Sequence, residues 1–449
     1  MRRLDWSELT AEARETALAR PGQRGDPALQ AAVRAIVEDV RTRGWTTVVA
    51  QAERIDGAAP ALVPVAPLAE EARRTLSTEQ LRAINLAHRN ITAFHKGSLP
   101  AEHEVETMPG LSVRKLWRPI DPIGLYIPGG KTPLFSTLLM LAIPARVAGV
   151  REIVVVTPPR APAEAGAQDS DATGPLLSQG NLDPVIALAA DLCGISAIWT
   201  LGGAQAIAAI GFGAGPIPRV AKICGPGNAW VAEAKTQLAA LPGGPAIDLP
   251  AGPSELLVIA DDSADPALVT ADLLSQAEHD ASAQVLLVTP SAVFADKVAA
   301  RIEADAASLP RADIALASLA NARLILTDSL KQAAEIANLY APEHLSLAVD
   351  DPEPLVARIT NAGAIFAGHG AAETFGDYLA GSSHVLPTDG AARAWSGVSV
   401  FTFLKAISVQ SVTDEAARRL APPAAALARL EGLEAHARAA DARLAGVEA

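Results

Sequence analysis

Apolar and polar positions follow two different periods along the chain. In the first hundred residues, Ala28–Arg43 and Leu76–Phe94 carry apolar residues at three- and four-residue spacing between charged ones, which predicts amphipathic helices. After Pro119, short apolar runs are bounded by Gly or Pro, which is typical of buried strands. These runs are Ile153–Thr157, Ile195–Trp199, Ala221–Cys224, Glu255–Ile259, Val285–Val288, Leu324–Leu326, Leu345–Val349 and Ala364–Phe366.

Stretches of helical length separate these strands. Asp183 before Pro184 and Asp265 before Pro266 each place a capping carboxylate ahead of a first-turn proline. Alternating strands and helices predict parallel sheets covered on both faces, an α/β architecture, with too many units for one sheet. We therefore expect two α/β domains. Arg160–Asn181 has no periodicity and predicts a loop insertion.

Composition narrows the class of protein. A net charge of -13 argues against a nucleic-acid surface, and two cysteines among 449 residues argue against a disulfide framework, as expected in a reducing compartment. Residues 192–218 carry no charge, but glycines and prolines interrupt them, so we expect a strand, a turn and a buried helix over Ala204–Ile210 there and no membrane span. The N-terminus does not resemble a signal peptide.

Two short motifs carry side chains suited to catalysis. Gln276 and His279 lie one turn apart at the end of a predicted helix, where they could form half of a metal site; alternatively, His279 caps the last carbonyls of the helix. Glu343 and His344 follow Pro342 and precede a strand. These two proton acceptors suit a reaction that deprotonates an alcohol and later activates water, although an exposed pair without a role is the alternative.

Glycine-rich turns provide further candidates. Gly225-Pro226-Gly227-Asn228 joins a predicted strand to the helix Ala229–Leu241, an arrangement that presents backbone N–H groups to a phosphate. Gly129-Gly130 and Gly202-Gly203 repeat this pattern, but none forms the G-x-G-x-x-G motif, and tight packing turns are the alternative. A later glycine-rich segment carries Asp377 and His384, where an aspartate is more often a turn former.

In this order, the segments together resemble the histidinol dehydrogenases, enzymes of the last two steps of histidine biosynthesis. The similarity runs from about residue 20 to the end of the chain. The segments that carry it are GLYIPGG (124–130), LGGAQAIAA (201–209), ICGPGNAWV (223–231), LPAGPSELLVIAD (249–261), DLLSQAEH (272–279), YAPEHL (340–345), GDYLAGSSHVLPT (376–388) and EGLEAH (431–436).

The resemblance implies a reaction and its site. It implies a zinc- and NAD-dependent, four-electron oxidation of L-histidinol through the aldehyde to L-histidine, with one Zn2+ per subunit and Glu343 and His344 as the proton-handling pair. The implied zinc ligands are Gln276, His279 and Asp377 of one subunit and His436 of the other. Ser254, Glu431 and His344 would contact the substrate together with the zinc ligands, and Tyr126, Gln205 and Asn228 would contact NAD.

The resemblance also implies an organisation. It implies two incomplete Rossmann-like domains, one of residues 25–124 with 254–398 and one of 125–253 that binds NAD. A helical segment of residues 1–24 precedes them. A tail of residues 399–449 reaches across an intertwined homodimer and donates Glu431 and His436 to the site of the other subunit. We expect a cytoplasmic enzyme. One alternative is oxidation of another small primary alcohol, such as a sulfonated diol. A catalytically silent nucleotide sensor would require a broken Glu343-His344 pair, which is intact.

Overall fold

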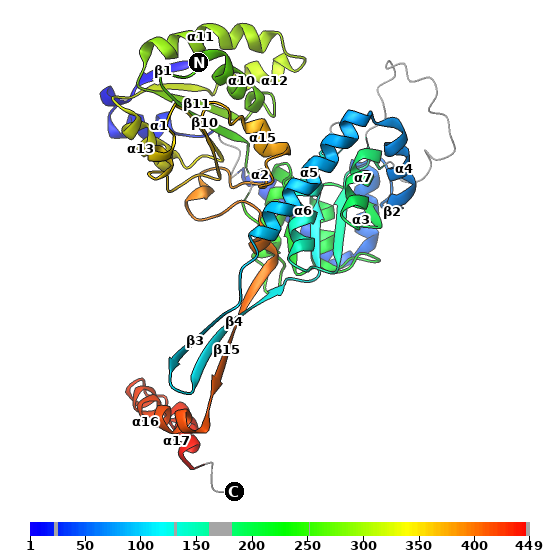
Figure 1. The fold of residues 1–449 in the computed structure, drawn as a ribbon. Coiled ribbons are helices and arrows are strands. Elements are labelled where there is room, and N and C mark those ends of the chain that lie inside the picture. Colours follow the sequence, from blue (N-terminus) through cyan, green and yellow to red (C-terminus); the bar gives the residue numbers. More distant parts are fainter. Residues whose placement is uncertain (22–25, 130–132, 161–181, 251, 446–449) are drawn as a thin grey trace.

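The computed structural model describes residues 1–21, 26–129, 133–160, 182–250 and 252–445. It contains two units, each built on a six-stranded sheet, and a slender arm that projects away from both (Figure 1). We name the units after their central strands, β5 (Ile123–Tyr126) and β10 (Glu255–Ala260). The fold is α/β, as the sequence predicts.

The β5 unit has the strand order β2-β7-β6-β5-β8-β9. Its pairs are parallel except that β2 runs antiparallel to β7. The other strands are β2 (Ala61–Pro64), β6 (Ile153–Thr157), β7 (Ala197–Thr200), β8 (Lys222–Cys224) and β9 (Ala246–Ile247).

Helices cover both faces of the β5 sheet, which is why its central strands are apolar throughout. One face packs against α2 (Pro27–Arg43), α3 (Trp45–Ile55), α8 (Gly203–Phe212) and α9 (Ala229–Ala239). The other packs against α4 (Val65–Thr75), α5 (Thr78–Gly97), α6 (Phe135–Val147) and α7 (Pro184–Leu192).

The β10 unit has the strand order β1-β12-β11-β10-β13-β14, and all of its pairs are parallel. Its other strands are β1 (Arg2–Asp5), β11 (Gln284–Thr289), β12 (Arg323–Leu326), β13 (His344–Ala348) and β14 (Ala364–Ala367). Its helices are α1 (Ala11–Ala17), α10 (Pro266–Ala277), α11 (Ala292–Ala307), α12 (Ala312–Leu319), α13 (Leu330–Tyr340), α14 (Glu353–Val356) and α15 (Glu373–Tyr378). The 3-10 helices η1 (Trp6–Glu8), η3 (Ala391–Arg393) and η4 (Val400–Phe403) complete the elements of the two units.

The arm is a three-stranded antiparallel sheet that carries two helices at its tip (Figure 1). Its elements are β3 (His103–Met108), β4 (Leu111–Pro119), β15 (Leu404–Val412), α16 (Asp414–Leu430) and α17 (Glu434–Ala445). The tip exposes large apolar side chains, with Leu427 and Leu430 at 65% and 84% of full exposure. Such a face is typical of a surface that packs against another molecule.

The predicted strands and helices are present, with ends that shift by a few residues. The domain boundaries differ from the expectation. Residues 25–124 were expected with 254–398, but β2 pairs with β7 and α2 packs against α8 and α9, so these elements belong to the β5 unit. Residues 1–24 were expected to form a helical segment, yet β1 joins the β10 sheet beside β12. The spacing of apolar residues in the sequence shows that one face of a helix or strand is buried, but it does not show which of the two sheets that face packs against. The predicted loop insertion lies, but for Arg160, outside the described residues.

None of the described helices combines the length and the apolar composition that crossing a membrane requires.

Candidate active site

The carboxyl edge of the β5 sheet contains a topological switch point. From β5 the chain continues to β6 and β7 on one side, and β8 then pairs with β5 on the other. In open α/β sheets, ligands bind in the crevice at this point, beyond the carboxyl ends of the two strands. Here Tyr126 ends β5, and the turn Gly225–Gly227 follows β8 and leads into α9.

A buried ion pair holds that turn from both sides. The amide of Gly225 donates to Asp248 Oδ2 at 2.6 Å, and Lys235 Nζ donates to the Gly225 carbonyl at 2.9 Å and to Asp248 Oδ1. Both charged side chains are almost fully buried. Breaking such a pair by removing one partner typically costs about 3–5 kcal/mol, so we expect the pair to fix the conformation of the turn.

The expected proton-handling pair, Glu343 and His344, lies at the amino edge of the β10 sheet, where β10 and β13 begin side by side. Glu255, the first residue of β10, contacts both members of the pair through its backbone. Its N–H donates to Glu343 Oε2 at 2.9 Å, and its carbonyl lies 3.1 Å from His344 Nδ1. Both side chains are buried, so the exposed pair that the sequence left open as an alternative is wrong.

The Glu255 carbonyl determines which imidazole nitrogen of His344 can act as a base. A carbonyl only accepts hydrogen bonds, so Nδ1 carries the hydrogen. Nε2 has no hydrogen-bond partner among the described residues and lies 3.6 Å from Asp377 Oδ1. In its neutral form the imidazole would therefore have its lone pair at Nε2.

One cavity of about 180 Å3 unites the edges of the two units. A single small molecule bound there would touch both the turn Gly225–Gly227 and the side chains of Glu343 and His344. Its lining includes Gly225, Pro226, Gly227, Lys235 and Asp248 from the β5 unit, and Ser254, His279, Glu343, His344 and Asp377 from the β10 unit.

Negative charge exceeds positive charge in this cavity. Burial would lower the pKa of His344, but the carboxylates of Glu343, Glu373 and Asp377 raise it well above its ordinary value. Burial raises the pKa of Glu373 to about 8. Burial opposes ionisation of Asp377 too, yet the adjacent His344 lowers the pKa of this carboxylate. Such a site favours a bound cation.

Comparison with known proteins identifies the family. The family model for histidinol dehydrogenase matches residues 19–444. This chain belongs to the histidinol dehydrogenase family. It is therefore an oxidoreductase.

Relatives match over almost the full chain. Histidinol dehydrogenase of Xanthomonas euvesicatoria is 44% identical over 445 residues, 99% of each chain, and that of Vibrio parahaemolyticus is 41% identical over 446 residues, 99% of this chain and 98% of the relative. The crystal structure of histidinol dehydrogenase from Elizabethkingia anophelis has a TM-score of 0.91 and 38% identity, and the match covers 100% of this chain and 99% of that one.

The expected metal ligands of this histidinol dehydrogenase family member suit a divalent ion. His279 and Asp377 line the cavity, while Gln276 lies one helical turn before His279 with its amide fully buried. Neither amide atom of Gln276 has a hydrogen-bond partner among the described residues, although buried amides are normally satisfied. No group of three or more His, Cys, Asp or Glu side chains in the described part of the chain could hold an ion. The set thus fits a metal but is incomplete within one chain.

The residues expected to contact NAD border the switch point. The Tyr126 hydroxyl accepts from Gly203 N–H at 3.3 Å, and Gln205 is buried in the first turn of α8. Asn228 is the N-cap of α9, and its Oδ1 accepts from the amides of Trp230 and Val231. These two hydrogen bonds hold the Asn228 side chain against the first turn of α9.

Glu431 and His436 are exposed at the tip of the arm, at the end of α16 and in α17. Neither lines the cavity of its own chain. The structure thus brings together five of the predicted residues in the cavity and leaves these two apart from it. The lining does not include the other four, which are Gln276, Tyr126, Gln205 and Asn228.

Sequence reasoning missed several residues of the site. Glu373 is buried with an Oε1 oxygen 3.8 Å from His344 Nδ1, and the Lys235–Asp248 pair had no motif to mark it. The sequence left His384 undecided; it lines the cavity, with Nδ1 2.9 Å from the Asp377 carbonyl. His369, also undecided, instead contacts Asp350 at 3.2 Å.

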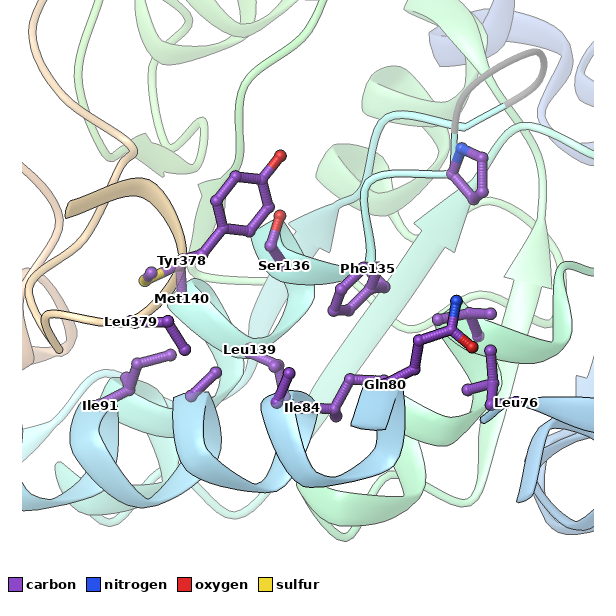
Figure 2. A pocket seen from close by; sticks show the side chains of 14 residues that line it. Leu76, Gln80, Ile84, Ile91, Phe135, Ser136, Leu139, Met140, Tyr378 and Leu379 are labelled. Carbon is purple, nitrogen blue, oxygen red and sulfur yellow. The ribbon is translucent and has the colours of Figure 1, made fainter. Parts of the chain in front are cut away.

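A second cavity of about 390 Å3 adjoins the first one (Figure 2). Its walls come mainly from α5 and α6, with Tyr378 and Leu379 at one side, and it shares Ser136 and Tyr378 with the first cavity. Among the described residues, its lining is apolar apart from Gln80, Ser136 and Tyr378.

Proposed function

We propose that this enzyme oxidises L-histidinol through L-histidinaldehyde to L-histidine, with zinc bound in the cavity and NAD at the β5–β8 edge. One observation carries the proposal. A single cavity is bordered by a glycine turn at a nucleotide-type switch point on one side and by the Glu343–His344 pair on the other. An NAD-linked oxidation that also moves protons needs these two features in contact with one small substrate.

Two groups would complete the site. Gln276, His279 and Asp377, with His436 of the partner subunit, would hold zinc, which would supply a fixed positive charge that binds the amine and imidazole of the substrate. Tyr126, Gln205 and Asn228 would contact NAD, which would supply the hydride acceptor for each of the two oxidations. The unpartnered amide of Gln276 and the excess of carboxylates support the metal assignment.

His344 and Glu343 would divide the proton transfers. His344 Nε2 is the nitrogen free to accept the hydroxyl proton while the carbinol C–H bond breaks, because Nδ1–H is held by the Glu255 carbonyl. Glu343, anchored through Oε2, has its second carboxylate oxygen available to take a proton from the water that attacks the aldehyde. The buried position of both groups would protect the aldehyde from side reactions.

A homodimer would complete the substrate site. Ser254 lies in the cavity, whereas Glu431 and His436 lie on an arm that projects away from the two units of their own chain (Figure 1). We propose that the arm reaches the other subunit and places these two residues at its cavity. The exposed leucines of the tip support an association of this kind.

The stoichiometry of the reaction tests the proposed function. Purified, metal-analysed enzyme supplied with limiting L-histidinol and excess NAD should form two NADH and one L-histidine per substrate. A sulfonated diol supplied in the same way should give little NADH. One NADH per histidinol, with the aldehyde released, would contradict the four-electron reaction, and preference for the diol would reassign the substrate.

A further inference from the structure

Arg20 enters the β10 unit from the segment that follows α1 and is bound to the first residue of β10. Its Nε and Nη2 donate to the two carboxylate oxygens of Glu255 at 2.5 and 2.9 Å. The Glu255 side chain is 2% exposed and that of Arg20 16%. A planar guanidinium that meets both carboxylate oxygens fixes orientation as well as charge.

Arg20 also holds the turn that leads to the proton-handling pair. Nη2 donates to the Tyr340 carbonyl at 2.8 Å, and the guanidinium lies 3.9 Å from the centre of the Tyr340 ring. The next residue, Ala341, has a φ of +54°, a conformation that residues other than glycine seldom adopt without support from their surroundings. Arg20 therefore ties the start of β10 to the turn just before Glu343.

These contacts bear directly on the catalytic geometry. The backbone N–H and carbonyl of Glu255 hold Glu343 and His344, and the turn 340–342 leads directly into the same pair. Arg20 touches both the Glu255 side chain and this turn. We propose that Arg20 is a positioning residue, which keeps Glu343 and His344 in register with each other and with the cavity. This inference rests on the proposed roles of Glu343 and His344.

If Arg20 had a purely structural role, its loss would affect stability and leave turnover unchanged. Arg14 offers a matched control for this alternative. Arg14 also lies in the N-terminal segment, donates to the backbone carbonyl of Trp6 at 3.0 Å and stacks over the ring of Trp6 at 5.1 Å. It makes comparable contacts with no link to Glu255 or to the catalytic turn. Loss of either arginine should lower the unfolding temperature, but only loss of Arg20 should impair turnover.

The experiment compares Arg20→Met, Arg20→Lys and Arg14→Met in the full-length enzyme, assayed well below all unfolding temperatures. We expect Arg20→Met to lower kcat with histidinol and with histidinaldehyde by roughly 10- to 100-fold, with less than about threefold change in either KM and unchanged zinc content. Arg20→Lys should recover part of kcat, and Arg14→Met should keep it.

Equal kcat values for the Arg20 and Arg14 variants would overturn the positioning role. If Arg20→Met does not fold, Arg20→Lys decides, because full kcat in that variant would equally overturn it. The wild-type control separates the two proposals, since wild-type enzyme that does not oxidise histidinol would refute the proposed function instead.

Discussion

At the scale of single side chains, the two proton acceptors differ in what holds them. His344 is fixed through Nδ1, which leaves Nε2 without a hydrogen-bond partner among the described residues, whereas Glu343 is fixed through one oxygen. We therefore expect unequal losses. His344→Asn should slow oxidation of the alcohol about 10²- to 10⁴-fold, because a positioned base contributes that much, and Glu343→Gln should harm oxidation of the aldehyde more. Separate assays with histidinol and histidinaldehyde measure the two steps.

Both variants are close in size to the residues they replace, so the unfolding temperature and zinc content serve as controls. Equal defects in the two half-reactions would reject the division of roles.

The sequence supplied these residues but not their arrangement. The motif around Pro342 predicts a carboxylate and an imidazole on one turn. It cannot predict that the carbonyl orienting His344 belongs to Glu255, almost ninety residues earlier, or that Glu373 is buried beside the ring. Such contacts depend on strand pairing between β10 and β13, which no local pattern encodes.

At the scale of elements, the turn after β8 depends on glycine. Gly225 has a φ of +124°, and a Cβ atom there would lie 2.1 Å from the Tyr126 carbonyl oxygen. We expect Gly225→Ala to lower the free energy of unfolding by about 1–3 kcal/mol and to raise the KM for NAD at least tenfold, because the turn would move away from the end of β5. Chemical denaturation and NAD titration of the initial rate provide the measurements.

Gly194→Ala is the matched control. Gly194 has a φ of +67° in the same unit, but nothing lies within 4 Å of the position of its Cβ. It should cost stability without changing the KM for NAD. An unchanged KM in the Gly225 variant would argue against this turn as part of the nucleotide site.

Elements were predictable where burial gave them a clear pattern. Most strands of the two sheets are continuous apolar runs between helices, and these were found to within two residues, whereas β1 reads Arg-Arg-Leu-Asp and was not predicted. The antiparallel arm was not predicted. β3 reads His-Glu-Val-Glu-Thr-Met and is almost fully exposed, so its sequence lacks the apolar run that marks a buried strand. The pairing of β3 with β4, and of β4 with β15, is held by backbone hydrogen bonds rather than by a core.

At the scale of the whole molecule, the sequence showed that there are two sheets but not which helices belong to each. It also indicated a separable tail, and the structure places that tail on an arm remote from the cavity of its own chain (Figure 1). The proposed ligand set is therefore split between two distant parts of one chain. Because of this separation, an experiment must decide whether His436 serves the cavity of its own chain or that of the other subunit in a dimer.

Complementation between two inactive variants answers that question. Gln276→Ala removes one proposed zinc ligand beside His279, and His436→Ala removes the proposed ligand on the arm. If the arm serves the other subunit, a heterodimer of the two variants has one intact site and one that lacks both ligands. Random assortment of equal amounts, by co-refolding or co-expression, should then restore about a quarter of wild-type activity and of zinc content. If the arm instead served its own chain, both sites of the heterodimer would stay defective, and the absence of recovery in a verified heterodimer would reject the shared site.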